Sequence, residues 1–180
     1  MAPLKPSPLI WLDLEMTGLE PDRHMILEIG CVVTDSQLIV MAEGPCFAIH
    51  HPESILTTMD PWCIEQHGKS GLTERCRRST MTVAEAETKT LAFLRQHCDE
   101  KGSPLCGNSI GQDRRFLYRY MPTLNNFFHY RNVDVSSIKE LVRRWYPDTQ
   151  APDKAKTHHV LDDIRESIEE LRFYRKTIFK

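Results

Sequence analysis

The sequence has no long apolar run and no excess of one charge, and each absence excludes a class of protein. No stretch approaches the roughly 18 consecutive apolar residues that a membrane-spanning helix needs. The formal net charge is only −2 at pH 7, so no overall cationic field marks a protein that clamps a long duplex. A short substrate held by a local site remains compatible with this charge.

The chain also lacks any C-x-x-C pair. Its six cysteines are irregularly spaced, which argues against a thiolate zinc site and against a disulfide framework. Cys31 and Cys106 lie in apolar, strand-like runs, and we expect both to be buried as small hydrophobic residues. The proline-rich segment 1–8 has no apolar stretch typical of a signal peptide, so we expect a cytoplasmic protein. A length of 180 residues suits a single domain.

The apolar periodicity of the sequence predicts an α/β protein. Strands are expected at 9–15, 26–34, about 38–50, 104–107 and 133–135. Helices are expected at 82–98, in a segment that carries Asp113 and Phe116, at about 137–146 and at about 160–178. Early antiparallel strands, followed by strands that alternate with helices, predict a mixed sheet flanked by helices. Loops are expected at 147–156, which is polar and broken by proline, and around Arg75, Arg77 and Arg78.

The first strand carries the most informative pair of residues. Asp13 and Glu15 point to the same face of an extended strand, whereas Ile10, Leu12 and Leu14 point to the opposite, core-facing side. Two carboxylates on one face repel each other and resist burial. A hard divalent cation would turn this liability into a binding site, because Mg²⁺ prefers oxygen ligands. A D-x-E pair considered alone, however, more often indicates an edge strand with a solvated acidic face.

Two other segments place acidic residues at the start of predicted helices. Asp113 follows Asn108 by five residues, and Asp163 follows His158 by five residues. Considered separately, these acids are explained by the helix dipole, which favours negative charge in the first turn. A histidine at a helix start is likewise usually solvated.

Taken together, the three segments resemble a known family. D-x-E on a first strand, N-x-x-x-x-D before a middle helix and H-x-x-x-x-D before a late helix are similar to the three motifs of the DEDDh 3′-to-5′ exonucleases. The longer stretches 10–19, 106–117, 128–136 and 161–167 resemble the oligoribonuclease family, and the similarity spans nearly the whole chain. The resemblance implies one 3′-5′ exonuclease domain over residues 1–180. It also implies a ribonuclease H-like exonuclease fold with a mixed five-stranded sheet.

The resemblance further implies a metal-dependent exoribonuclease that hydrolyses very short RNA, especially dinucleotides, to 5′-mononucleotides. Asp13, Glu15, Asp113 and Asp163 would hold two divalent ions, Mg²⁺ or Mn²⁺, with Asp13 bridging them. Whether Asp113 acts directly or through a water is left open. His158 matches the general base of the family. The neighbouring His159 and Asp162 are not expected to take these roles, because only His158 and Asp163 keep the family's spacing.

A set of substrate-binding residues is implied in the same way: Leu19, Trp62, His67, Ser109, Gln112, Tyr130, Arg131 and Ser136. Leu19 and Trp62 would contact the bases, and His67 would line the same pocket. Arg131, Ser109 and Ser136 would cap a 5′ phosphate, with Lys139 as a weaker candidate. Tyr130 and Arg131 would reach into the partner's site of a homodimer. Without the resemblance, Trp62 is a partly buried packing residue and Tyr130 an ordinary interface aromatic.

Two alternatives remain at this point. One is a DEDDh enzyme that trims the 3′ ends of longer RNA or DNA, and the other is a catalytically silent RNA-binding module. The presence of all five catalytic residue types argues against the second alternative.

Overall fold

The sheet of this protein has five strands and is mixed, as predicted. The structure is a computed structural model that describes residues 7–151 and 159–179. The strands run in the order β3-β2-β1-β4-β5. β1 pairs antiparallel with β2, β2 pairs antiparallel with β3, and β4 and β5 continue the sheet parallel to β1. Their bounds are β1 Leu9–Met16, β2 Ile26–Thr34, β3 Val40–Ala48, β4 Leu105–Gly107 and β5 Asn132–Asp134.

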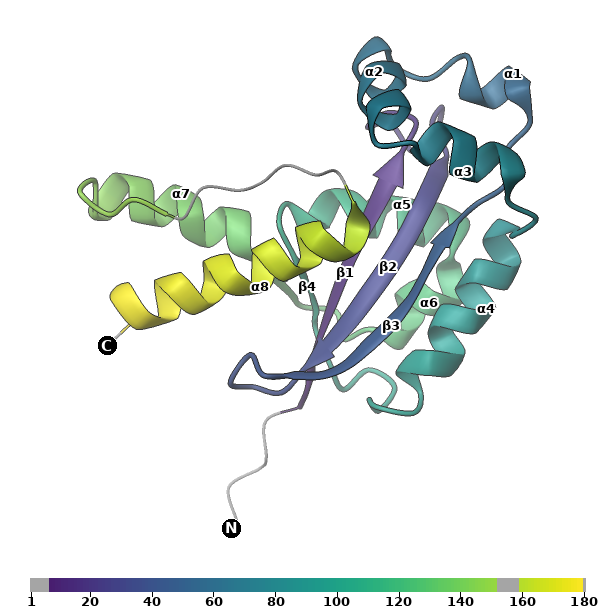
Figure 1. Cartoon of the computed structure of the whole chain (residues 1–180). Coiled ribbons are helices and arrows are strands. Elements are labelled where there is room, and N and C mark those ends of the chain that lie inside the picture. Colours follow the sequence, from purple (N-terminus) through teal and green to yellow (C-terminus); the bar gives the residue numbers. More distant parts are fainter. Residues whose placement is uncertain (1–6, 152–158, 180) are drawn as a thin grey trace.

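The helices surround this sheet (Figure 1). Their bounds are α1 Glu53–Leu56, α2 Pro61–Lys69, α3 Leu72–Arg78, α4 Val83–Leu94, α5 Ile110–Tyr120, α6 Pro122–Phe127, α7 Val135–Trp145 and α8 Val160–Thr177. Figure 1 shows α2 and α3 above the end of the sheet where β1 finishes and β2 begins. α4 starts with a capping box, in which the Thr82 side chain accepts from the Glu85 N–H and Glu85 reaches back to Thr82.

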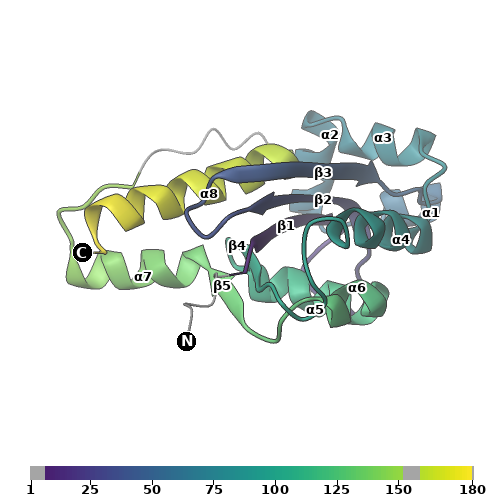
Figure 2. The same cartoon turned by 90° about the horizontal axis from the view of Figure 1, so that it is seen from below.

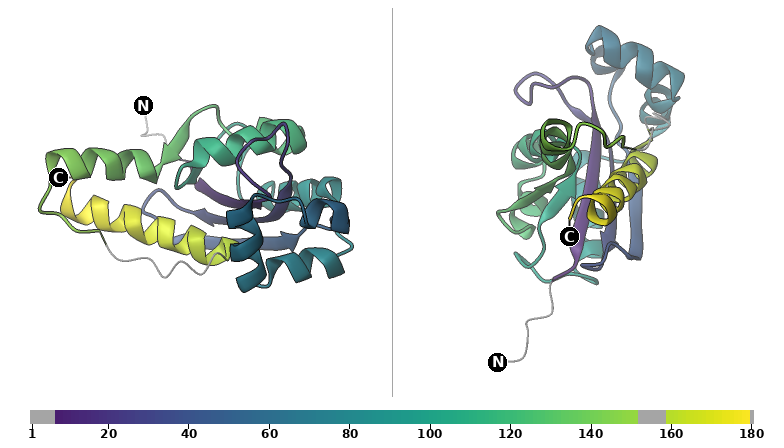
Figure 3. Two further views of the ribbon diagram at one scale, coloured as in Figure 1. Left: turned by 90° about the horizontal axis from the view of Figure 1, so that it is seen from above. Right: turned by 90° about the vertical axis from the view of Figure 1, so that its left-hand side faces the viewer.

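Alternation along the strands divides the core between the two faces of the sheet. Ile10, Leu12 and Leu14 join the core under α4, α5 and α6, as the sequence predicts. Trp11 points to the opposite face, where it packs with Val160 and other apolar residues of α8. Figures 2 and 3 show the helices distributed around the sheet in this way. Asp13 and Glu15 therefore lie on the face that α8 covers.

The helical segment between β3 and α4 was not predicted. Arg75, Arg77 and Arg78 were expected in a loop, which is wrong because they lie in α3. Arg77 pairs with Glu53 of α1 at 2.9 Å, and both Arg77 and Arg78 pair with Glu74 one turn earlier. These ion pairs neutralise the arginines. The helices involved are short, so the apolar stripe of each is only a few residues long. The short α6 was also missed.

The structure also tests the predictions made for Val135 and for the cysteines. Val135 was expected to end a strand, but it begins α7, because Asp134 caps this helix by accepting from the Ser136 N–H. All six cysteines are unpaired, and Cys31 and Cys106 are fully buried, as expected. Within the described residues, no helix is both long enough and apolar enough to cross a membrane.

Candidate active site

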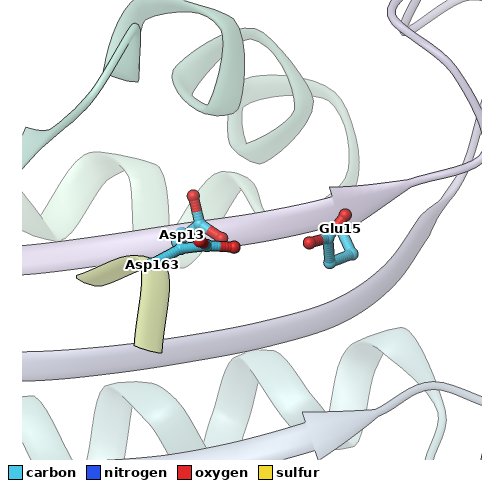
Figure 4. A group of neighbouring side chains, drawn as sticks. All are labelled: Asp13, Glu15 and Asp163. Carbon is cyan, nitrogen blue, oxygen red and sulfur yellow. The ribbon is translucent and has the colours of Figure 1, made fainter. Parts of the chain in front are cut away.

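Three carboxylates from distant parts of the chain meet at one point. Asp13 and Glu15 come from β1, and Asp163 comes from the first turn of α8. One oxygen from each lies within 4.8 Å of the others, and Figure 4 shows the group. The start of α8 reaches this position because residue 30 on β2 is glycine. A Cβ at Gly30 would lie 2.5 Å from Cγ1 of Val160.

The surroundings of this trio oppose its negative charge. Burial raises the pKa of Asp13 well above its usual 3.8, and the charges of Asp113, Glu15 and Asp163 raise it further. Burial also raises the pKa of Glu15 to about 8, with Asp163 as the next largest cause. A bound cation would reverse this effect by favouring the ionised forms. Three convergent carboxylate oxygens are the ligand type that Mg²⁺ and Mn²⁺ prefer, so the residues fit a divalent cation.

Asp113 approaches the trio from α5 without joining the tight group. Strand β4 ends at Gly107, which leaves the edge of β1 open beyond Leu12. Asp113 Oδ1 accepts the N–H of Leu14 at that edge, at 3.0 Å. Burial raises the pKa of Asp113 to about 7, although the hydrogen bond from Leu14 acts in the opposite direction. Asp113 thus fixes the strand that carries Asp13 and Glu15, and it adds negative charge close to Asp13.

The structure also reveals a fifth acid that sequence reasoning missed. Glu28 on β2 lies opposite Glu15 in the antiparallel register and is almost fully buried. Arg75 of α3 pairs with it at 2.7 Å, and the positive charge of Arg75 lowers the pKa of Glu15. Two signals in the sequence pointed to this residue. Glu28 is the only charged residue of the strand 26–34, and a hairpin with the first strand can bring it opposite Glu15.

The predicted general base, His158, lies outside the described residues. The two nearby residues that were not expected to take part, His159 and Asp162, are described. His159 is exposed at the N-cap of α8, and Asp162 pairs with Arg165 at 2.9 Å. The structure therefore brings Asp163 to Asp13 and Glu15, and it turns Asp162 toward the helix surface.

The residues expected to contact the bases fall into two classes. The Leu19 side chain, after β1, and the Trp62 side chain, in the first turn of α2, are both more than half exposed. His67 is different, because only 1% of it is exposed. Its Nε2 lies 2.9 Å from the carbonyl oxygen of Met16, and its Nδ1 lies 3.9 Å from Glu15 Oε2. The structure thus places His67 beside Glu15, beneath the surface.

Two of the residues expected to cap a phosphate, Ser109 and Ser136, meet at the N-terminus of α5. Ser109 adopts a left-handed conformation with φ 51°, and its N–H donates to Ser136 Oγ at 3.0 Å. Its hydroxyl lies 3.1 Å from the same oxygen. Gln112, one turn on, donates to the carbonyl of Leu19 and so ties α5 to the loop after β1. Lys139 pairs instead with the buried Glu170 at 2.9 Å.

Tyr130 is presented outward by its neighbours. Tyr130 is 73% exposed. Its ring centroid lies 4.4 Å from that of His129, and the guanidinium of Arg131 lies 5.3 Å from its ring centre. Arg114 of α5 donates to the carbonyls of His129 and Tyr130 and fixes this loop. A hollow of about 770 Å³ on the outer side of α5 is lined by Arg114, Tyr118 and Asn132, and by none of the three clustered acids.

Comparisons with known proteins agree with this geometry. An exonuclease family model, RNase_T, matches residues 10–171. The oligoribonucleases of Pseudomonas aeruginosa and Marinobacter nauticus are 60% and 59% identical over 176 and 173 residues, covering 97% and 96% of this chain and 98% and 96% of the relatives. The Vibrio cholerae oligoribonuclease is 58% identical over 173 residues, with 96% of each chain covered.

Solved structures show the same fold at low sequence identity. Exonuclease I from Methylocaldum szegediense has a TM-score of 0.70 at 19% identity, and an E. coli exonuclease I–ssDNA complex has a TM-score of 0.74 at 14% identity. The alignments cover 97% and 96% of this chain but only 41% of the exonuclease I chains. These likenesses confirm the exonuclease fold, and the full-length matches establish the family. The chain belongs to the oligoribonuclease family of exonucleases.

Proposed function

We propose that this protein is a metal-dependent 3′-to-5′ exoribonuclease that degrades very short oligoribonucleotides, above all dinucleotides, to 5′-mononucleotides. This would be the final step of RNA degradation. The observation that carries the proposal is the convergence of Asp13, Glu15 and Asp163 from β1 and α8. Membership of the oligoribonuclease family supplies the reaction and the substrate class.

The carboxylates are the proposed cation ligands. Asp13, Glu15 and Asp163, with Asp113 beside them, would hold two divalent ions, Mg²⁺ or Mn²⁺. Bound cations would activate the attacking water and stabilise the leaving 3′ oxygen. The chain contributes a rigid arrangement, because Asp113 fixes the Leu14 N–H and His67 fixes the Met16 carbonyl on either side of Glu15.

His158 is the proposed general base. The sequence motif supports this role, since the residue lies five positions before Asp163. Neutral imidazole accepts a proton readily near neutral pH, because an unperturbed histidine has a pKa of about 6.5. In the proposed reaction, His158 takes the proton of the attacking water.

The side chains proposed to bind the substrate favour a short RNA. Leu19 and Trp62 offer exposed apolar surfaces on which bases can stack. Ser109 and Ser136 at the N-terminus of α5 would bind a 5′ phosphate through their hydroxyls, because their N–H groups already donate to Asp134 Oδ1. A continuous basic track would be needed for long RNA, and arginines such as Arg77, Arg78 and Arg144 are paired with glutamates. The same pairing disfavours an enzyme that trims long 3′ ends.

We also propose a homodimer in which Tyr130 and Arg131 complete the partner's site. The exposure of Tyr130, and of Tyr118 nearby on α5, supports a partner at this surface. Arg131 has fixed donors suited to phosphate oxygens, so it would extend the cap formed by Ser109 and Ser136. Placement of the protein in the cytoplasm stays a prediction.

The test is a comparison of two substrates. With Mg²⁺ present, the protein should hydrolyse a 5′-phosphorylated dinucleotide much faster than an octamer of the same base composition, and EDTA should stop both reactions. Equal or faster cleavage of the octamer would show that the protein trims longer RNA instead. Binding of RNA without any hydrolysis in Mg²⁺ or Mn²⁺ would support the silent RNA-binding module.

A further inference from the structure

The loop between β1 and β2 carries Leu19 and is fastened to the start of α2, which carries Trp62. Asp60 is the N-cap residue of α2, and its backbone N–H donates to the carbonyl of Thr17 at 2.9 Å. Trp62 follows two residues after Asp60, and Leu19 follows two residues after Thr17. This single hydrogen bond therefore connects the two segments that bear the exposed apolar side chains.

A buried histidine strengthens the same connection. His24 lies at the end of the loop and is only 6% exposed. Its Nδ1 accepts the N–H of Glu20 at 3.0 Å, so the proton of the neutral ring is on Nε2. Nε2 lies 3.4 Å from Asp60 Oδ1. The ring thus joins Glu20, directly after Leu19, to Asp60, the N-cap residue of α2.

Gly18 shows how closely these groups are packed. A Cβ at position 18 would lie 2.5 Å from Asp60 Oδ2 and 2.5 Å from His24 Cε1. The backbone next to Leu19 therefore rests directly on the side chains of His24 and Asp60. On the far side of the loop, the hydroxyl of Tyr120 lies 2.8 Å from the carbonyl oxygens of both Pro21 and His24. The loop is held from both sides, which is unusual for a connection between two strands.

We propose that His24 and Asp60 are positioning residues that fix the gap between Leu19 and Trp62, and that this gap sets the affinity for a dinucleotide. The proposal rests on the proposed function, because it takes Leu19 and Trp62 as the base-contacting residues. Neither His24 nor Asp60 touches the reacting phosphate in this account. Their effect should therefore appear in substrate binding and leave the chemical step unchanged.

The experiment compares His24→Ala and Asp60→Ala with the wild-type protein on two substrates. One is a 5′-phosphorylated dinucleotide, and the other is the p-nitrophenyl ester of uridine 5′-monophosphate, which has a single base. Both variants should raise KM for the dinucleotide about tenfold, within the range of one stacking contact, and leave kcat nearly unchanged. Both should leave KM and kcat for the ester unchanged. Unchanged KM for the dinucleotide, or an equal loss of kcat on both substrates, would overturn the proposal.

Matched variants separate positioning from loss of stability. Asp60→Asn keeps an oxygen facing His24 Nε2 and should restore nearly wild-type KM. Gly18→Ala should act like His24→Ala, whereas Gly68→Ala, where a Cβ meets no atom within 4 Å, should have no effect on KM. In a Trp62→Ala background, His24→Ala should add little further loss. Fully multiplicative losses in the double variant would contradict a shared role.

Direct binding keeps this proposal separate from the proposed function. Failure of the wild-type protein to hydrolyse the dinucleotide would refute the proposed function. The affinity of a fluorescent dinucleotide, measured in Ca²⁺ without turnover, then decides the positioning claim. An affinity that is about tenfold weaker in His24→Ala would support it, and equal affinities would refute it.

Discussion

At the residue scale, the site depends on carboxylates that the fold buries against their preference. Asp13 is the most strongly affected, because burial and four neighbouring acids all oppose its ionisation. Asp13→Asn should therefore reduce hydrolysis by at least about 100-fold, as expected when a preorganised charge is removed. The same variant should raise the melting temperature of the cation-free protein. The shift should be about 2–4 °C for each kcal/mol added to the free energy of unfolding.

Dinucleotide hydrolysis checks the first outcome, and thermal unfolding in EDTA checks the second. Asp162→Asn is the matched control, since Asp162 lies one position from Asp163 but pairs with Arg165 at the surface. Wild-type turnover in Asp13→Asn would contradict the role of the trio.

The raised pKa values give stability a definite dependence on pH. The pKa of Glu15 in the fold is about 8, above its usual 4.5, so this group stabilises the protein fully below pH 4.5 and loses that contribution as pH rises through 8. In EDTA, the melting temperature should fall between pH 5 and pH 8, and Glu15→Gln should flatten the fall. Added Mn²⁺ should stabilise the protein more at pH 8 than at pH 5, because cation binding displaces protons. A Mn²⁺ effect independent of pH would contradict these shifts.

At the scale of helices and strands, the contact between α8 and β2 places Asp163. Gly30→Ala would put a Cβ 2.5 Å from Val160 Cγ1 and push the start of α8 away from the sheet. Mn²⁺ affinity, measured by calorimetry, should fall at least about tenfold, since one of the three proposed ligands moves. Adding Val160→Ala removes the clashing methyl group and should restore part of the affinity. Full affinity in Gly30→Ala would show that α8 does not set the site.

The same scale shows what the sequence could and could not predict. The long strands and α4, α5, α7 and α8 were predicted, because their apolar residues repeat over eight or more positions. β4 and β5 were also found, as short apolar runs between helices. α1, α2, α3 and α6 were missed. α1, α3 and α6 have only four to seven residues, too few for a periodic stripe, and α2 has only two buried residues, Cys63 and His67. They are held by contacts distant in sequence, such as the pair between Arg77 and Glu53.

At the scale of the whole molecule, the convergence of Asp13, Glu15 and Asp163 was predictable only from the family motifs. Each acid alone had a local explanation, either a solvated strand face or a helix dipole. Glu28, Arg75 and the His24–Asp60 pair were not found, because their roles depend on strand register and on how α2 and α3 pack. The burial of His67 depends on the same packing and was likewise not visible in the sequence.

The proposed dimer can be tested by combining two defective subunits. Tyr130→Ala retains its acids, and Asp13→Asn retains its tyrosine. A mixed dimer should therefore contain one complete site and recover about half of the wild-type turnover, with each parent homodimer impaired. The activity of the purified mixed dimer is the measurement. Recovery no greater than the mean of the two parents would contradict a tyrosine that acts across the interface.

Anomalous diffraction from crystals grown with Mn²⁺ and a dinucleotide monophosphate tests the central claim most directly. We predict anomalous peaks at about 2.0–2.3 Å from carboxylate oxygens of Asp13, Glu15 and Asp163, with the 3′ nucleotide beside them. An active protein whose manganese peaks all lie away from these three residues would contradict the account.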